Sequence, residues 1–455
     1  MLTRIEIDGF KSFADFSLDI PPFLAIVGPN AAGKSNLFDA IQFLSRLVGD
    51  TVDRAFVGAR GEPAELFRRK GASGTADTMR FAVEVLLEPT FVDRFGKTVP
   101  VRHTRLRYEV RVARWADDGV ARSYVDDESV RPITDTDDNW VHQRDVSDEF
   151  RSAYLHYGYR QALLETIDRP EDGPHFVVLQ EDAGERREIP IEEAAATFLS
   201  SGVTAADHPT LYALRQEMQS WQLLHVEPAA LRRPSFDGPA GPLSVNGDNL
   251  ASVLRRIERQ TADETGSMLR EIAADLARVV RGVVDLRVAE GTSRGQWELF
   301  LRTRAEGWIS ARVTSDGTLR VVALLAALYD PAGAGLICYE EPENGIYPQK
   351  LLDLLLVLRS LVTDVRAPGD FPLAQLLLTS HSPVVLSAVP AEQLVVFDWV
   401  TRIVPADGER SRVTRARQIR KAGLEPVPLD QVGRYMTEAE RRTMIDLDEA
   451  AKILG

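Results

Sequence analysis

The segment Gly28–Ser35 constrains the fold of this chain more than any other stretch. It reads Gly-Pro-Asn-Ala-Ala-Gly-Lys-Ser, which matches the phosphate-loop pattern G-x-x-x-x-G-K-[ST]. The apolar run Phe23–Val27 before it predicts a buried strand, and the apolar spacing across Ser35–Leu47 predicts a helix. A strand, a loop and a helix in this order predict a nucleotide site, because loop N–H groups and a helix N-terminus bind phosphate oxygens.

The residue types in this loop suit that chemistry. Gly28 and Gly33 allow the backbone to turn tightly around an anion. Lys34 can reach the β- and γ-phosphates, and the hydroxyl of Ser35 can bind Mg²⁺. A glycine-rich turn without a ligand is the alternative interpretation, and it leaves Lys34 without a role.

Composition narrows the class of protein. The 455 residues suffice for two or three domains, and no apolar run reaches the 18 residues that would predict a transmembrane helix. The one cysteine, Cys338, excludes an internal disulfide framework and a cysteine metal site. The charged, alternating N-terminus predicts a strand rather than a signal peptide, so we expect a cytoplasmic protein with no membrane partner. The net charge of −14 disfavours nucleic-acid binding over the whole surface and leaves a local basic groove open.

The N-terminal region has several strand patterns. Residues 2–8 and 16–20 alternate, which predicts an antiparallel hairpin leading into the phosphate-loop strand. Two further strands are predicted at 81–87 and 106–112. The charged residues predicted to face outward on the last strand are Arg105, Arg107, Glu109 and Arg111.

Residues 96–220 are predicted to form an insertion. Its acidic clusters, 126–128 and 135–138, fit a solvated loop better than a metal site. The part from 151 to 220 is predicted to be mostly helical, with a short strand at Phe176–Leu179.

Strand and helix patterns alternate beyond the insertion. Residues 221–226 predict a strand and 249–284 a helical stretch of at most 36 residues. A pair of strands is predicted at 286–288 and 297–301.

Three later segments supply residues that suit a nucleotide site. Ser315 is an N-cap candidate for an apolar helix, and Gly317 keeps the approach to its N–H groups clear. One apolar strand ends in Glu340 and Glu341, which can divide the work of holding Mg²⁺ and polarising a water. Another ends in His381, which can hydrogen-bond a γ-phosphate or that water. An ordinary capped helix and a structural histidine are the alternatives.

Together these segments resemble the ABC-type ATPase heads of the SMC/RecF/OLD group, and most of all the stand-alone bacterial "AAA family" (AAA_21-like) ATPases. The resemblance covers about 1–95 and 221–405. It implies an α/β fold, a P-loop NTPase of the ABC ATPase head type, with a mixed sheet, antiparallel N-terminal strands and a mostly helical insertion. The motifs that carry it, in family order, are Gly9-Phe-Lys-Ser-Phe13, the phosphate loop, Ser-Asp-Gly-Thr, Tyr-Glu-Glu-Pro-Glu-Asn-Gly-Ile-Tyr-Pro and Thr-Ser-His-Ser-Pro.

The resemblance also implies a head-to-tail homodimer, or a higher homo-oligomer, that encloses ATP and Mg²⁺ between subunits. Glu341 is then the catalytic carboxylate, His381 the switch histidine and Lys34 the catalytic lysine. Glu340 and Ser35 serve Mg²⁺. The residues expected to bind the nucleotide are Gly28, Asn30, Gly33, Lys34, Ser35 and Asn36 of one subunit and, at the γ-phosphate, Ser315 and Gly317 of the other.

The sequence departs from the family in several places. Glu340 stands where an Asp is usual, and Ser-Asp-Gly-Thr replaces Ser-x-Gly-Gln/Glu. The long coiled coil of SMC proteins is missing, so a DNA-entrapping ring is not expected. Gln222 is the nearest candidate for the Q-loop glutamine. Asp446 and Asp448 match an attached nuclease weakly, and the capping box Thr437–Glu440 places them on a solvated helix.

The resulting hypothesis is a Mg²⁺-dependent ATPase that dimerises around ATP, in DNA repair or anti-phage defence. The alternative is an ATP-gated scaffold that holds a separate effector, a nuclease or a toxin. A DNA-binding repair factor would need a basic stripe, with candidates at Arg232-Arg233, Arg255-Arg256 and the arginines of 105–111. The expected domains are 1–95 and 286–405 as the two halves of the head, 96–220 as the insertion, 221–285 as a helical lobe and 406–455 as a tail.

Overall fold

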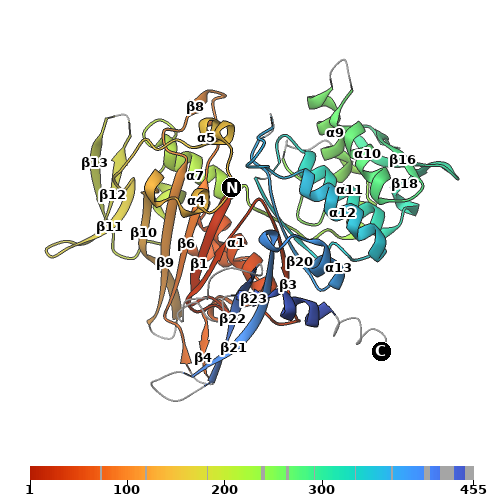
Figure 1. The fold of residues 1–455 in the computed structure, drawn as a ribbon. Helices are drawn as coiled ribbons and strands as arrows, with labels where there is room; N and C mark the ends of the chain where they lie inside the picture. Colours follow the sequence, from red (N-terminus) through yellow and green to blue (C-terminus); the bar gives the residue numbers. More distant parts are fainter. Residues whose placement is uncertain are drawn as a thin grey trace.

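The computed structural model describes residues 1–71, 74–117, 120–181, 183–236, 241–262, 266–291, 293–333, 335–369, 372–403, 410–420 and 435–445. Figure 1 shows a strand-rich N-terminal part, a helical lobe, and a sheet that lies between them. The expected α/β fold, a mixed sheet with antiparallel N-terminal strands, is confirmed.

The central sheet positions the phosphate loop. Its described strands lie in the order β14 (Gln222–Leu224), β19 (Leu336–Glu340), β20 (Gln375–Ser380), β3 (Phe23–Val27), β21 (Leu394–Ile403), β22 (Arg410–Arg420) and β23 (Tyr435–Thr437). The strands from β14 to β21 run parallel, and β22 is antiparallel to β21. Because both faces are covered, β3 is apolar throughout: Leu24 and Ile26 face one core, and Ala25 and Val27 face the other.

The N-terminal sheet is antiparallel. Its described strands follow the order β13 (Glu185–Pro190), β12 (Gly173–Gln180), β11 (Leu164–Arg169), β10 (Val120–Pro132), β9 (Arg105–Asp117), β6 (Thr78–Leu86), β1 (Leu2–Asp8) and β2 (Phe16–Asp19). The predicted hairpin of β1 and β2 and the predicted strands at β6 and β9 are confirmed. Two small ribbons accompany this sheet: β4 (Arg69–Lys70) with β5 (Gly74–Thr75), and β7 (Thr90–Val92) with β8 (Thr98–Pro100).

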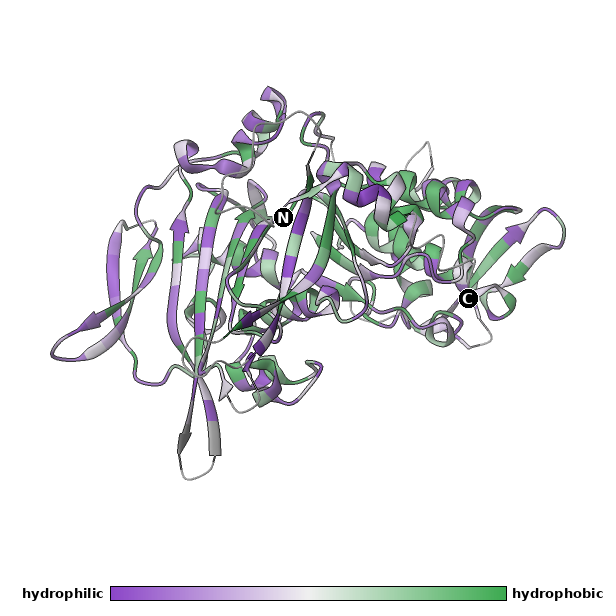
Figure 2. Cartoon of the chain, turned by 60° about the horizontal axis from the view of Figure 1, so that its bottom comes forward, coloured by the Kyte–Doolittle hydropathy of each residue, from purple (hydrophilic) through white to green (hydrophobic). Residues whose placement is uncertain are grey.

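The prediction of a mostly helical insertion is wrong. Strands β9 to β13 continue the N-terminal sheet, and the helices of 96–220 are short: α4 (Asn139–His142), α5 (Asp148–Tyr154), α6 (Phe198–Ser201) and α7 (Pro209–Gln219). Strand β13 is exposed on both faces, so its sequence carries no apolar alternation that could mark it as a strand. Figure 2 shows hydrophilic residues along this outer edge of the sheet. The strand predicted at Phe176–Leu179 is confirmed within β12.

Two of the acidic residues assigned to solvated loops are buried. Asp138 forms an ion pair with Arg105, whose side chain is fully buried although the sequence predicted it to face outward. The segment carrying Asp138 folds over the end of β9, which explains why the arginine is covered. Glu128 is also fully buried and accepts hydrogen bonds from the N–H groups of Phe198 and Leu199.

The helical lobe covers the face of the central sheet that carries Ala25 and Val27. It contains α9 (Leu250–Thr261), α10 (Met268–Val279), α11 (Asp316–Tyr329), α12 (Pro348–Ser360) and α13 (Pro383–Ala388). The predicted helical stretch 249–284 is therefore two helices, because α9 ends at Thr261 and β16 already begins at Val283. A small sheet completes the lobe: β15 (Ser235–Phe236), β17 (Gln296–Thr303), β16 (Val283–Glu290) and β18 (Gly307–Ser310).

The remaining described helices are α1 (Lys34–Leu47), α2 (Val52–Phe56), α3 (Pro63–Leu66) and α8 (Pro228–Leu231). The predicted capping box is confirmed, since Thr437 and Glu440 exchange hydrogen bonds at the start of a helical segment, 438–445. Asp446 and Asp448 lie outside the described residues. In the described part of the chain, no helix combines the length and the hydropathy that spanning a bilayer requires.

Candidate nucleotide site at the carboxyl edge of the central sheet

The phosphate loop has the predicted strand–loop–helix geometry. It connects β3, which ends at Val27, with α1, which begins at Lys34. Gly28 and Gly33 have φ angles of 151° and 97°. A Cβ atom on Gly28 would lie 2.1 Å from the carbonyl oxygen of Phe397, and one on Gly33 would lie 2.1 Å from the Thr414 hydroxyl. Both positions therefore require glycine.

Lys34 is buried, and no carboxylate of the described residues is in hydrogen-bond contact with it. Its Nζ donates to the carbonyl oxygens of Gly28, at 2.8 Å, and of Pro29, at 3.0 Å. Burial lowers the pKa of Lys34 to about 8, while the charges of Glu341, Glu343 and Glu340 act to raise it. A buried ammonium held only by carbonyls can exchange these partners for an anion that enters the loop.

The parallel register brings three strand ends to one edge, which we call the carboxyl edge. Val27 is the register partner of Ser380, and Glu340 that of Thr379. Parallel neighbouring strands end at the same side of a sheet, so β3, β19 and β20 deliver Lys34, Glu340–Glu341 and His381 to this edge. The sequence prediction that these segments meet is correct in this respect.

Glu341 is held in a strained conformation. Its φ angle is +52°, which is uncommon for a residue other than glycine. Its N–H donates to the carbonyl of Thr379, and its Oε2 accepts a hydrogen bond from Asn344 at 2.8 Å. His381 Nε2 lies 3.6 Å from Glu341 Oε1. The carboxylate and the imidazole, both partly exposed, can therefore act on the same small molecule.

Glu340 fits the role of a magnesium ligand. Its Oε1 is buried and has no hydrogen-bond partner among the described residues. A carboxylate oxygen without a hydrogen-bond partner suits Mg²⁺ or its water shell, and Arg60 contacts both Glu340 and the carbonyl oxygen of Ser35. The described residues contain no group of three His, Cys, Asp or Glu side chains arranged to hold a metal.

Ser315 and Gly317 occupy a different position. Ser315 is the N-cap of α11, as the sequence predicted: its hydroxyl accepts a hydrogen bond from the N–H of Thr318. Gly317 packs against the loop after Glu341, where a Cβ atom would lie 2.1 Å from the carbonyl of Gly345. Ser315 is exposed, and no hydrogen bond among the described residues joins it to the phosphate loop. The helix start is therefore presented to the surface.

The two asparagines predicted to bind nucleotide differ in their surroundings. Asn30 is exposed in the phosphate loop. Asn36 donates to the Ser12 hydroxyl, which in turn contacts Thr414. Beside them lies a hollow of about 380 Å³. The cationic side chains that line it are Lys11, Arg69, Arg410 and Arg412.

Sequence reasoning missed three residues at this edge. Arg60 donates to the carbonyl of Ser35 at 3.0 Å and lies 3.8 Å from Glu340. Glu343 accepts hydrogen bonds from the Ser380 hydroxyl, at 2.8 Å, and from the N–H of His381, at 2.9 Å. His225 Nδ1 lies 3.9 Å from Glu340 Oε2. Glu343 belongs to a motif already singled out, whereas no pattern marks Arg60 or His225.

Gln222 does not reach this edge. It lies at the start of β14, where its side-chain amide donates to the carbonyl of Leu243. The residue of the same segment that approaches Glu340 is His225, which follows the carboxyl end of β14.

The candidate residues for a basic stripe are largely paired with acids. Arg107 contacts Glu6 and Glu109, and Arg256 forms an ion pair with Asp330 at 2.6 Å. The other described pairs that involve these candidates are Arg105–Asp138, Arg111–Asp126 and Arg232–Asp316. These five arginines are therefore ion-pair partners of acidic side chains in the structure.

Comparison with known proteins adds a family. The family model AAA_21, described as "AAA domain, putative AbiEii toxin, Type IV TA system", matches residues 23–387. This range includes the phosphate loop, Ser315, both strand-end carboxylates and His381.

The curated relatives include proteins named chromosome partition protein Smc. The Smc protein of Mycobacterium tuberculosis is 29% identical over 288 residues, which are 61% of this chain and 22% of that protein. The Smc protein of Methanocaldococcus jannaschii is 61% identical over 44 residues, which are 10% of this chain and 4% of that protein. The chain thus spans less than a quarter of the length of these relatives.

Solved Smc heads are similar over nearly the whole chain. The Smc head bound to the C-winged helix domain of ScpA is 13% identical, with a TM-score of 0.48, and covers 91% of this chain and 97% of its own. The Smc head domain with a coiled coil and joint from Pyrococcus yayanosii is 13% identical, with a TM-score of 0.45, and covers 98% and 99%.

Proposed function

Because this chain belongs to the AAA_21 family and carries an SMC/RecF-like ABC-type ATPase head, we propose that it binds ATP with Mg²⁺ and hydrolyses it. The observation that carries this proposal is the convergence of Lys34, Glu340, Glu341 and His381 on one sheet edge. The Glu340 oxygen that has no hydrogen-bond partner among the described residues supports it further, because it suits a bound metal ion.

Each residue has a distinct role in this proposal. The N–H groups of the loop and the ammonium of Lys34 hold the β- and γ-phosphates. Ser35 and Glu340 hold Mg²⁺, which supplies positive charge to the phosphates when bound. Glu341 orients the attacking water and accepts its proton, and His381 hydrogen-bonds the γ-phosphate or that water. Arg60, beside Ser35 and Glu340, adds positive charge to the same phosphates.

We further propose that two copies of the chain complete the site. Ser315 caps α11, and Ser315 and Asp316 at the start of this helix are exposed. A second copy can bring its α11 N-terminus to the γ-phosphate, where N–H groups and the helix dipole favour negative charge. The setting we propose is anti-phage defence or DNA repair, and the family description, which names a toxin–antitoxin system, favours defence.

Phosphate release at several protein concentrations tests the proposal. Glu341→Gln serves as the blank, because it keeps the shape of the side chain and removes the base. We expect the rate per subunit to rise with protein concentration, as a site shared between two subunits requires. Equal rates for Lys34→Ala and wild type would contradict hydrolysis at this site.

Two additions to the same assay separate the alternatives. Stimulation by duplex DNA would favour a DNA-sensing role. ATP-dependent dimerisation without phosphate release would instead support an ATP-gated scaffold that holds a separate effector.

A further inference from the structure

A cavity of about 590 Å³ lies far from the phosphate loop. Its lining includes Gly335 and Ala374, which directly precede β19 and β20, so it opens at the amino edge of the central sheet. Glu340 and His381 lie at the opposite ends of these strands. The cavity is therefore separate from the proposed nucleotide site.

Both halves of the molecule contribute apolar walls to this cavity. Leu87 and Phe91 come from the N-terminal part, and Met268, Leu328 and Leu361 come from the helical lobe. A volume of this size, with mostly apolar walls, is typical of sites for small organic ligands, which occupy about 300–1,000 Å³.

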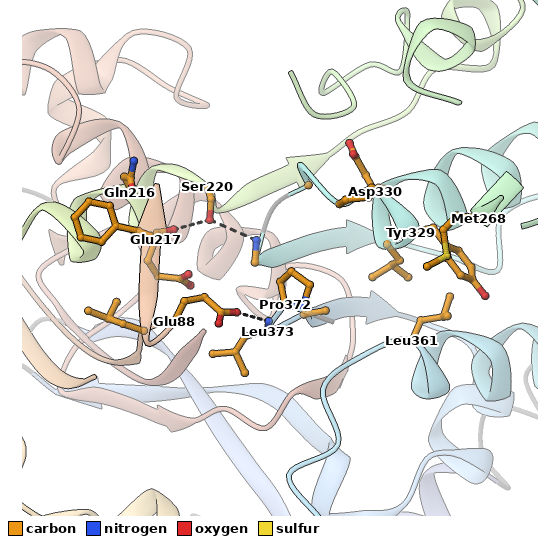
Figure 3. Close-up of a pocket in the computed structure, with 18 of the residues that line it drawn as sticks. Glu88, Gln216, Glu217, Ser220, Met268, Tyr329, Asp330, Leu361, Pro372 and Leu373 are labelled. Carbon is orange, nitrogen blue, oxygen red and sulfur yellow. Dashed lines mark hydrogen bonds between the residues drawn. The ribbon is translucent and has the colours of Figure 1, made fainter. Parts of the chain in front are cut away.

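The ionisable residues of the lining are acidic. They are Glu88, Glu217, Glu271 and Asp330, and none of the described lining residues is Lys, Arg or His. Figure 3 shows the carboxylates of Glu88 and Glu217 on one side and the Tyr329 and Met268 side chains on the other. Glu88 and Glu217 thus lie together on one side of the cavity, whereas Asp330 lies on the side of Tyr329.

Two of these carboxylates already have cationic partners. Glu217 accepts a hydrogen bond from the amino group of Met1 at 2.5 Å, and Asp330 pairs with Arg256 at 2.6 Å. In the described part of the chain, Glu88 and Glu271 have no cation within ion-pair distance. Burial raises the pKa of Glu88, although the N–H of Leu373 donates to its Oε1. Glu88 and Glu217 therefore have one nearby cation, the amino group of Met1, for two carboxylates.

We propose that this cavity binds a small organic cation, an amine or guanidine carried on an apolar body. The cationic group would pair with Glu88 beside Glu217, and the body would fill the space between Phe91, Met268 and Leu361. A cation relieves the unfavourable burial of the Glu88 carboxylate, whereas an anion adds a like charge. A bare metal ion leaves the apolar walls unfilled. The proposal goes beyond the proposed function and does not rest on it, because the site is tested without ATP.

Three compounds with the same ring test the charge preference directly. Tryptamine is the cation, indole-3-ethanol the neutral analogue and indole-3-propionate the anion, each titrated calorimetrically into the full chain without nucleotide. We expect saturable tryptamine binding, at least about tenfold tighter than that of the anion, with the alcohol between them. Since tenfold is the effect of about 1.4 kcal/mol, one partly buried charge pair suffices.

Variants locate the binding. Glu88→Gln keeps an oxygen that can accept from the Leu373 N–H, so the fold is retained, and it should weaken tryptamine binding about tenfold. Glu306→Gln, on the exposed β17–β18 turn, is the matched control and should bind like wild type. Ala327→Trp, from the cavity wall, should abolish binding if the variant folds. No saturable binding of tryptamine or of 2-phenylethylamine, equal binding of the anion, or unchanged binding by Glu88→Gln would each overturn the proposal.

Discussion

Lys34 and Arg105 are both buried cations, and their partners differ completely. Every nitrogen of the Arg105 guanidinium has an acceptor: Nε and Nη2 donate to Asp138 at 2.6 and 2.9 Å, and Nη1 donates to Thr3 and Val85. Among the described residues, Lys34 donates only to two loop carbonyls, and Oε1 of the nearby Glu340 has no hydrogen-bond partner. A satisfied buried pair specifies structure, whereas an unsatisfied one leaves room for a ligand.

Removal of Arg105 should cause the largest change in stability. Arg105→Met leaves the fully buried Asp138 carboxylate without its cation, so we expect the free energy of unfolding to fall by about 3–5 kcal/mol. Arg111→Met is the control on the same strand, since that partly exposed pair with Asp126 should contribute about 1 kcal/mol or less. Chemical denaturation measures both. If the free energy of unfolding fell as little for Arg105→Met as for the control, the buried pair of Arg105 would not be a stabilising feature that distinguishes it from Lys34.

Removal of Lys34 should affect turnover rather than stability. Lys34→Ala takes away the ammonium that faces the phosphates, and we expect phosphate release to fall about 10²–10³-fold, as for other groups that stabilise transition-state charge. The free energy of unfolding should change by about 1 kcal/mol or less. The substitution removes two hydrogen bonds to carbonyls, but it also removes the cost of burying the ammonium group, and the two effects offset each other. If Lys34→Ala were destabilised as much as Arg105→Met, its unfolding midpoint would fall to a similarly low denaturant concentration. That result would show that Lys34 mainly stabilises the fold.

Glu128 lies between these two cases and gives a pH prediction. It accepts hydrogen bonds from Phe198, Leu199 and Tyr108 but has no cation, and burial raises its pKa to about 7 from an ordinary value near 4.5. The unfolded chain loses this proton first, so the stabilisation is present below pH 4.5 and is lost as pH rises to 7. Relative to Glu128→Gln, the wild-type free energy of unfolding should fall by roughly 3 kcal/mol across this window.

Denaturation of both proteins at pH 4.5, 5.5 and 7 measures the difference. Parallel profiles would mean that the three hydrogen bonds alone keep the Glu128 carboxylate ionised. The number of hydrogen bonds to a buried charged group would then affect stability more than the presence of an oppositely charged partner, which is the difference between Lys34 and Arg105.

The sequence predicts the carboxyl edge better than it predicts the insertion, for a physical reason. Short motifs fix Gly28, Lys34 and Glu341 because backbone conformation and phosphate chemistry admit few residue types there. Strand β13 and the buried pair of Arg105 have no such restriction, since exposed strands accept polar residues on both faces. Charged residues are rarely buried, so the residue type of Arg105 predicts that its side chain is exposed.

At the candidate site as well, the residues that the sequence did not predict are those placed by contacts between segments distant in the chain. Arg60 reaches Ser35 and Glu340 only because the loop before α3 folds back onto α1. His225 reaches Glu340 through the pairing of β14 with β19, which no spacing within either segment encodes.

Titration of Lys34 gives the smallest and most specific test. The pKa of Lys34 is lowered to about 8, so the ligand-free loop loses its positive charge as pH rises through that value. Affinity for ATP should then weaken, by at most about tenfold per pH unit above 8, because binding must first restore the proton. A fluorescent ATP analogue titrated from pH 7 to 9.5 measures this slope, and Lys34→Arg, which keeps its charge, should flatten it. A wild-type profile as flat as that of Lys34→Arg would mean that the carboxylates around Lys34 hold its proton as firmly as Asp138 holds Arg105.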